Sequence, residues 1–455
     1  MSSSRLRPDC LNIWEVLAQS IAMIGPTITP VLIVPLMYAQ AGDAGWLAYV
    51  FGAIMLATVA LNVNVFASRS ASAGSLYVFA LRAFGSRGGL FIGWCQLWAY
   101  AFVALAGATG FAVFLPGLLA RVHVPVSATA SLVICLGIAW FLSYRDVRIS
   151  TIALLVLEAI SIALIAVLTV LIFIHRGGAW FDAGQFALHG FSFSALALGT
   201  VLAVFSMLGF ESATSLGEEA HDPLRTIPRA VLGSVAVTGI FFVITMYAEV
   251  LGAHALATPL DKLVTPLDAL ADSVGAPSMK IPIDIGALLC SISIATAALN
   301  GAARALLVMA RTGLMPAPFA QTDPVHETPA RALGAIAATV GIGGAALLLA
   351  GRAPIDAFSD TASLSSYAFV VIYAGISIGA SFYLRALGEL RVRHIAISTL
   401  AIVFLLVPAI GSVYPLPPWP TTIYPLLFVA YAALGVAILW RRPQAASPLA
   451  LDAGI

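Results

Sequence analysis

Charged residues are scarce in this 455-residue sequence, where Asp, Glu, Lys and Arg together make up only 9%. Hydrophobic residues account for 61%, and the mean hydropathy is +1.00. A soluble globular domain carries roughly 25% charged residues, so this composition excludes an ordinary soluble protein. We therefore expect an integral membrane protein whose main partner is the lipid bilayer.

Patterns for several other functions are also missing. No Gly-rich phosphate loop occurs, which argues against ATP hydrolysis by this chain. The seven histidines lie in loops or at the ends of apolar stretches, and no stretch carries an arginine ladder. The four cysteines have neither metal-ligand nor redox spacing. We expect no disulfide, no cofactor, no metal, no enzymatic activity and no nucleic-acid partner.

What the sequence has instead is a series of apolar stretches long enough to cross a bilayer. A hydrocarbon core about 30 Å thick needs roughly 20 helical residues. Twelve such stretches lie near 13–38, 45–67, 88–117, 126–143, 149–174, 195–217, 229–253, 282–310, 332–350, 361–384, 395–414 and 422–440. The predicted fold class is an all-α polytopic membrane protein with twelve transmembrane helices. The polar start and the long first stretch argue against a cleaved signal peptide.

The positive charges are distributed unevenly between the two sides that this topology defines. Seventeen of the 22 Lys and Arg residues fall on the side of the N-terminus, and five on the other. Because loops rich in Lys and Arg stay in the cytoplasm, both termini are expected to be cytoplasmic. The compact chain without long soluble tails favours a bacterial inner membrane.

The first stretch is interrupted at its middle. Pro26 and Pro30 remove backbone hydrogen bonds there, and Gly25 precedes them. A simple proline kink is one interpretation, and an unwound segment that faces a ligand is the other. We expect the stretch that follows the second span, residues 68–85, to form a loop.

The sixth stretch has a matching interruption. It reads LAVFSMLGFESATSLGEEA, with Gly209 followed by the carboxylate of Glu211. A charged group inside a membrane costs about 2.5 to 3.5 kcal/mol or more, and broken backbone is tolerated only when it is buried or lines a cavity. Paired interruptions in the two halves of a chain indicate the binding site of a transporter built from inverted repeats.

Two further groups of polar residues lie within spans. Glu158 in the fifth span is either functional or a protonated packing residue, and Ser161 follows it. The eighth span carries hydroxyl and amide side chains that could line a cavity or permit close helix packing: Ser291, Ser293, Thr296 and Asn300.

Three segments resemble the amino acid-polyamine-organocation superfamily of secondary transporters. Residues 74–85, GSLYVFALRAFG, are similar to its Gly-x-x-Tyr…Arg-x-x-Gly segment. Residues 209–230, GFESATSLGEEAHDPLRTIPRA, resemble a second signature, with Asp222 in place of Asn. Residues 300–333 are similar to the end of the family's eighth span and the loop after it.

This resemblance implies a five-plus-five inverted repeat with discontinuous first and sixth helices and two peripheral helices. The expected division is a cytoplasmic tail 1–11, a first repeat 12–175, a second repeat 195–384, two helices in 395–440 and a cytoplasmic tail 441–455. The substrate's carboxylate would lie on amides of the first break, and its ammonium on carbonyls of the second. The implied substrate-binding residues are Gly25, Thr27, Ile28, Phe205, Ser206, Leu208 and Gly209.

The resemblance also implies gating and coupling roles. Phe205 occupies the place of an aromatic gate, and Glu211 matches a carboxylate implicated in proton-dependent gating in some relatives. Glu158 is the second candidate for a proton. Where some relatives have a lysine in the fifth span, this chain has Ser161, so a sodium ion held by Ser161, Ser293 or Thr296 is the alternative.

The leading hypothesis is a proton-coupled importer of a small amino acid with an uncharged side chain. A transporter or exchanger of cationic amino acids or polyamines is the main alternative, and a sodium symporter is another. From a different class, a non-transporting receptor or an enzyme on the same scaffold would bind a ligand without moving it. The sequence does not fix the oligomeric state.

Overall fold

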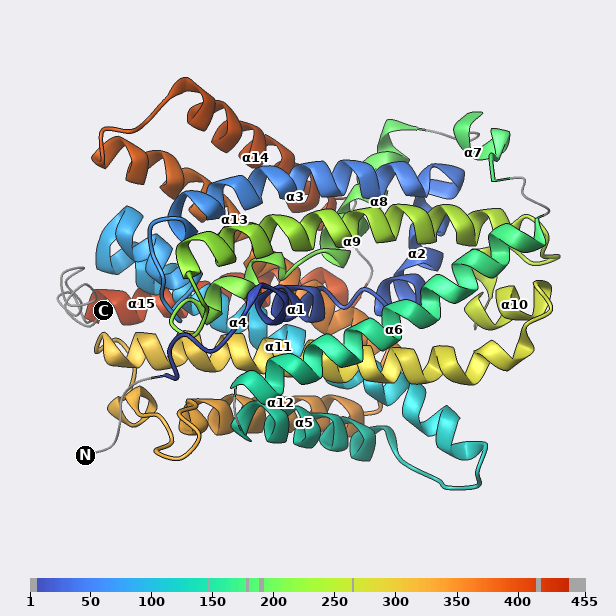
Figure 1. Ribbon diagram of the computed structural model, residues 1–455, viewed down its shortest axis with the longest axis horizontal. Helices are drawn as coiled ribbons and strands as arrows, with labels where there is room; N and C mark the ends of the chain where they lie inside the picture. The colour runs from blue at the N-terminus through green and yellow to red at the C-terminus, as the bar shows by residue number, and fades with distance from the viewer. Residues whose placement is uncertain are drawn as a thin grey trace.

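The computed structural model describes residues 6–145, 147–176, 180–187, 192–263, 266–414 and 419–441. Most of the long helices run side by side along the long axis of the molecule (Figure 1). Within these ranges the structure has no strand, only an isolated parallel bridge between Leu11 and Ala220. This arrangement confirms the predicted all-α fold class.

The long helices of the bundle are α3 (Gly45–Ala67), α4 (Leu76–Ala120), α5 (Ala128–Arg145), α6 (Val147–His175), α8 (Phe193–Ser206), α9 (Pro223–Ala253), α11 (Lys280–Arg311), α12 (Ala330–Leu349), α13 (Pro354–Ala386), α14 (Val392–Gly411) and α15 (Tyr424–Arg441). Shorter elements are α1 (Ile13–Ile24), η1 (Thr29–Ile33), α2 (Val34–Ala41), η2 (Gly42–Ala44), α7 (Ala183–Ala187), η3 (Phe210–Leu216), η4 (Leu260–Lys262), α10 (Pro266–Ser273), η5 (Pro277–Met279), η6 (Ala317–Ala320) and η7 (Thr421–Ile423).

Eleven helical stretches among the described residues are long and apolar enough to cross a membrane. The first of them, Ile13–Ala67, has 55 residues and contains the predicted stretches 13–38 and 45–67. The chain turns between these two at Gly42, whose φ of +53° ends α2 before η2. The chain is thus a polytopic membrane protein, and the count of twelve spans stays a prediction.

The first predicted interruption is present in the structure. Asn12 caps α1 by accepting hydrogen bonds from the N–H groups of Trp14 and Glu15, and Glu15 bonds back to the Asn12 N–H. The helix ends at Gly25, which has a φ of +68°, because a left-handed residue followed by a proline cannot continue it. A π-helical turn, η1, then leads into α2.

The second predicted interruption is present as well. Helix α8 ends at Ser206, and Gly209 adopts a φ of +94° before the 3₁₀ helix η3. The hydroxyl of Ser20 on α1 donates to the Phe210 carbonyl at 2.6 Å and accepts from the Ala213 N–H at 2.9 Å. The two interrupted helices are therefore hydrogen-bonded directly to each other.

One local prediction is wrong. Residues 68–85 were expected to form a loop, but α4 already begins at Leu76. Gly85, with a φ of +72°, interrupts the helix instead of ending a loop. The reason is burial, since Leu76, Val78 and Leu81 pack inside the protein and favour the helix.

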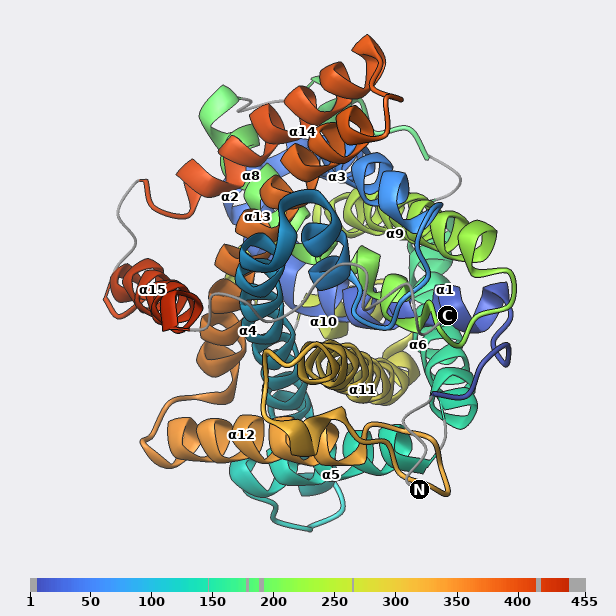
Figure 2. The same cartoon turned by 90° about the vertical axis from the view of Figure 1, so that its left-hand side faces the viewer.

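The bundle has a clear centre and periphery. The apolar window of the span that contains α11 is 72% buried, whereas those of α14 and α15 are 22% and 17% buried. Figure 2 shows α14 and α15 at the outside, with α11 seen end-on among the other helices. The two peripheral helices expected from the family resemblance are present, and α11 is placed to line the interior.

The predicted chain divisions have different outcomes. Of the two tails that were predicted to be cytoplasmic, residues 1–5 and 442–455 lie outside the described residues. The rest of the N-terminal segment is not free, because the N–H groups of Cys10 and Leu11 donate to the Glu219 carbonyl. The repeat boundaries 12–175 and 195–384 stay predictions.

Candidate functional site

A cavity of about 50 Å³ lies where the two interrupted helices meet. Its lining is mostly apolar and carries no charged side chain. Five of the seven residues expected to bind substrate line it, namely Gly25, Ile28, Phe205, Ser206 and Leu208. The other lining residues are Met23, Ile24, Thr29, Ile33, Val103, Ala106, Ile294, Phe358, Ala362 and Ser365.

The backbone of the first break is partly occupied in this conformation. The Gly25 N–H donates to the Ile21 carbonyl at 3.0 Å, and the Ile28 N–H donates to the Gly25 carbonyl at 3.1 Å. Thr27 is fully buried beside the cavity lining, and its hydroxyl oxygen has no hydrogen-bond partner among the described residues. A carboxylate bound here would compete with a backbone hydrogen bond at Gly25 and Ile28, but no backbone bond from the Thr27 N–H is found in the described part of the chain.

The second break is held from two sides. The Leu208 N–H donates to the Phe205 carbonyl at 3.2 Å, and the Ser206 hydroxyl donates to the Leu202 carbonyl at 2.9 Å. Gly209 does not line the cavity, but its N–H donates to the Tyr373 hydroxyl at 3.2 Å. The position therefore shapes the break and links it to α13.

Glu211 is not a lining residue of the cavity, and its carboxyl group is hydrogen-bonded to tyrosines. It is fully buried, and one of its oxygens accepts from the Tyr100 hydroxyl at 2.9 Å and the other from the Tyr373 hydroxyl at 2.5 Å. Two hydroxyl donors compensate much of the cost of burying a carboxylate. The sequence pointed to Glu211 but not to Tyr373, which is 162 residues away in the chain and carries no local signal.

Glu158 has much poorer hydrogen bonding. It is buried on α6, and its Oε2 accepts from the Ser161 hydroxyl at 3.4 Å, while Oε1 has no partner in the described part of the chain. The side chains of Cys290 and Ser293 on α11 face its carboxyl group. The structure therefore brings Glu158, Ser161 and Ser293 together.

This cluster adjoins the first break. The Cys290 sulfur would lie 3.5 Å from a Cβ placed on Gly25. Three buried oxygens around this junction, Glu158 Oε1, Ser293 Oγ and Thr27 Oγ1, have no hydrogen-bond partner within the described residues. Such a group of unsatisfied oxygens is suited to a proton or another small cation.

The remaining polar residues of α11 have structural partners. The Thr296 hydroxyl donates to the Ile292 carbonyl of its own helix at 2.7 Å. Asn300 donates to Ser150 on α6 at 2.8 Å, so it braces two helices. Of the three residues predicted as a cation site, Thr296 is the one for which no contact with the Glu158 cluster is found.

Glu249 is a buried acid that sequence reasoning missed. It lies near the end of α9, is 3% exposed, and neither carboxyl oxygen has a partner in the described ranges. Tyr49 lies near it and contacts the Ser206 hydroxyl of the cavity wall at 3.2 Å. A single acid close to the end of a span looks like an interfacial residue, so only burial identifies it.

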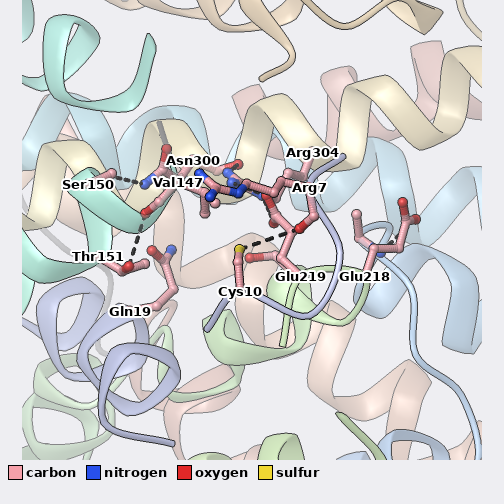
Figure 3. A network of polar contacts seen from close by, with 12 residues as sticks. Arg7, Cys10, Gln19, Val147, Ser150, Thr151, Glu218, Glu219, Asn300 and Arg304 are labelled. Atoms are coloured by element: carbon pink, nitrogen blue, oxygen red, sulfur yellow. Dashed lines mark hydrogen bonds and ion pairs between the residues drawn. The ribbon is translucent and has the colours of Figure 1, made fainter. Parts of the chain in front are cut away.

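A buried ion pair joins α11 to the segment that follows the second break. Arg304 of α11 donates to both oxygens of Glu219, at 2.7 and 3.0 Å, and the two side chains are 2% and 1% exposed. Figure 3 shows Arg304 beside Glu219, with Arg7 and Cys10 of the N-terminal segment close by. The pair thus lies between α11, the segment after η3 and the N-terminal segment.

At the opposite side, His254 lies between Asp43 and Asp182, with nitrogen-to-oxygen distances of 3.2 and 3.0 Å. Burial raises the pKa of Asp182, but hydrogen bonds from Gln185 and Gly184, together with His254, outweigh this and hold the pKa below its ordinary value. A lowered carboxyl pKa stabilises the fold above the ordinary Asp value, and this contribution is lost on acidification. The cluster therefore keeps three loop segments together at neutral pH.

Comparisons with known proteins place the chain in a family. The family model described as amino acid permease matches residues 16–414. The branched-chain amino acid permease BcaP of Bacillus subtilis is 27% identical over 361 residues, which cover 74% of each chain. The methylthioribose transporter of the same organism is 24% identical over 64% of this chain and 65% of its own. The low-affinity putrescine importer PlaP of Escherichia coli is 25% identical over 74% of this chain and 73% of its own.

Proposed function

The chain belongs to the amino acid permease family, and on this basis we propose that it imports a small amino acid with an uncharged side chain. Transport is secondary active and uses alternating access around the cavity between the two breaks. We further propose a bacterial inner membrane, with both termini in the cytoplasm, as the charge distribution favours.

The observation that carries this proposal is the neutral lining of the cavity. Apart from Thr29, Ser206 and Ser365 it is formed by apolar side chains and glycine. The ends of interrupted helices offer partial charges of both signs for an α-carboxylate and an α-ammonium. A side chain with its own charge would meet no opposite charge in this lining.

A polyamine or cationic amino acid is the second candidate, because one relative is a putrescine importer. Such a substrate needs an acid in contact with it. Glu211 is not a lining residue and already accepts hydrogen bonds from Tyr100 and Tyr373. This arrangement favours the neutral substrate.

For the coupling ion we propose a proton on Glu158. Its poorly hydrogen-bonded, buried carboxyl is far less costly when neutral than when ionised. Glu211, by contrast, already accepts from two hydroxyl donors, so its oxygens depend less on a proton. Because the cluster adjoins Gly25, the negative charge left by loss of the proton would act directly on the first break.

Replacing Glu158 by glutamine is expected to flatten the pH dependence of uptake. The wild-type rate should rise as the external pH falls, because transport requires the protonated form of Glu158. The variant mimics the protonated carboxyl permanently, so the remaining rate should vary less than about twofold between pH 5 and pH 8. Uptake of labelled substrate into proteoliposomes measures this.

Glu211→Gln is the matched control. It should lower the rate, because an amide cannot accept both tyrosine hydroxyls in the same way, yet leave the pH dependence in place. If Glu211→Gln flattens the profile and Glu158→Gln does not, the proton belongs to Glu211. If uptake instead requires sodium, the alternative site at Ser161 and Ser293 replaces this proposal.

A thermal-unfolding screen of the detergent-purified protein tests the substrate class. Small neutral amino acids and the branched-chain ones are expected to raise the unfolding temperature, whereas lysine and putrescine are not. A ligand at about 100 times its Kd adds roughly 2.7 kcal/mol of apparent stability, which such a screen detects. A response to polyamines alone would overturn the proposed substrate class. Ligand binding without uptake would indicate a receptor.

A further inference from the structure

A second cavity, of about 300 Å³, lies far from the breaks at the arginine-rich end of the bundle. Its walls come from Arg69, two residues after the end of α3, from the turn between α13 and α14, and from the first turn of α14. The lining residues are Arg69, Gly388, Glu389, Leu390, Arg391, Arg393 and His394. The transport cycle proposed above gives this cavity no role.

The charges around the cavity are not balanced. Arg69 forms an ion pair with Glu389 at 2.7 Å, which neutralises the one acid of the lining. Arg391 and Arg393 are exposed, and neither has a carboxylate partner in the part of the chain that the structure describes. Arg393 donates through Nε to His394 Nε2 at 3.3 Å, so its terminal guanidinium nitrogens and the guanidinium of Arg391 remain for an anion.

The backbone adds to this preference. Helix α14 has 20 residues and begins at Val392, between the two arginines. The His394 N–H already donates to the Arg391 carbonyl at 2.9 Å, which leaves the N–H groups of Val392 and Arg393 at the helix start. Such N–H groups carry partial positive charge, which favours a phosphate oxygen. Guanidinium groups bind phosphate through two parallel hydrogen bonds.

The surroundings indicate where the anion comes from. Helix α14 is peripheral, and Val392, Ile395 and Val403 along it are 83%, 48% and 53% exposed. Phe382 near the end of α13 is 54% exposed. In a membrane protein these side chains face acyl chains, so the cavity opens where a lipid headgroup meets the hydrocarbon region.

We propose that this cavity binds the phosphate of an anionic phospholipid, with Arg391 and Arg393 as its ligands and the lipid tails along the exposed side of α14. The ion pair of Arg69 and Glu389 forms the wall that holds the turn in place. The arginine-rich side is expected to be cytoplasmic, where anionic lipids attract basic residues.

The test measures lipid binding by the full-length purified protein, with native mass spectrometry and lipid-dependent thermal stabilisation as the two readouts. Phosphatidylglycerol should bind and stabilise the wild type, whereas phosphatidylcholine and inorganic phosphate should not. The double variant Arg391→Gln/Arg393→Gln should lose roughly tenfold in affinity for phosphatidylglycerol. Because transport is not measured, failure here leaves the proposed function untouched.

The matched control is Arg331→Gln/Arg385→Gln, which removes the same charge from exposed arginines outside the cavity. It should change the affinity by no more than about twofold. An equal loss in both double variants would reduce the effect to general surface charge and overturn the proposal. Equal binding of inorganic phosphate would overturn the lipid as the ligand.

A third variant keeps the test decisive if the glutamine variant cannot be purified. Arg391→Lys/Arg393→Lys retains both charges but loses the planar fork that binds phosphate at two points. Its affinity for phosphatidylglycerol should fall about threefold. An unchanged affinity would show that these two side chains do not hold the phosphate.

Discussion

Replacing Arg304 by methionine is expected to lower the apparent free energy of unfolding by about 3 to 5 kcal/mol. The variant leaves the Glu219 carboxylate buried without the guanidinium that donates to both of its oxygens. A buried charge without its partner is among the most costly defects in a folded protein. Thermal and denaturant unfolding of the purified variant measure the loss.

Arg311→Met is the matched control. Arg311 lies on the same helix as Arg304, and it pairs with Glu218, the residue before Glu219. That pair is longer, at 3.3 Å, and its side chains are 23% and 30% exposed. Solvent screens such a pair, so its loss should cost less than about 1 kcal/mol. Similar losses in the two variants would contradict the special cost assigned to the buried pair.

Replacing Gly209 by leucine is expected to abolish substrate binding and uptake. A Cβ at this position would lie 2.4 Å from Met23 Cγ, and Met23 lines the cavity. The side chain would push Met23 into the cavity, and the φ of +94° adds backbone strain. The distortion would also disturb the hydrogen bond from the Gly209 N–H to Tyr373. Ligand-dependent unfolding and proteoliposome uptake measure the two losses.

Gly351→Leu separates strain from obstruction. Gly351 has a similar φ of +90°, but a Cβ there meets nothing within 4 Å. This control should lose about 1 to 2 kcal/mol of stability and retain normal affinity. Normal affinity in Gly209→Leu would disprove the placement of the substrate at the second break.

The residues of the two breaks show how far sequence reasoning extends at the site. Gly209 and Gly25 were predicted as breaks because glycine and proline act on the backbone within one helical turn. Glu211 was singled out because a carboxylate in an apolar stretch is itself unusual. Its two partners, Tyr100 and Tyr373, come from helices more than 100 residues away in the chain. No local pattern marks them.

The predicted sodium site shows the same limit. Ser161 and Ser293 lie with Glu158, whereas the hydroxyl of Thr296 bonds to its own helix. These outcomes depend on how α6 and α11 are rotated against each other. In a helix that is apolar on all sides, hydropathy does not fix that rotation.

By itself the sequence determined the membrane class, the positions of the long helices and the two interruptions, because bilayer thickness and backbone chemistry act on short stretches of chain. Only the tertiary structure decided which acids are paired. It paired Glu211 with two tyrosines and Arg304 with Glu219, and among the described residues it left Glu158 Oε1 and both Glu249 oxygens without a hydrogen-bond partner. The physical reason is that the cost of a buried charge depends on donors brought from distant helices, and packing alone selects them.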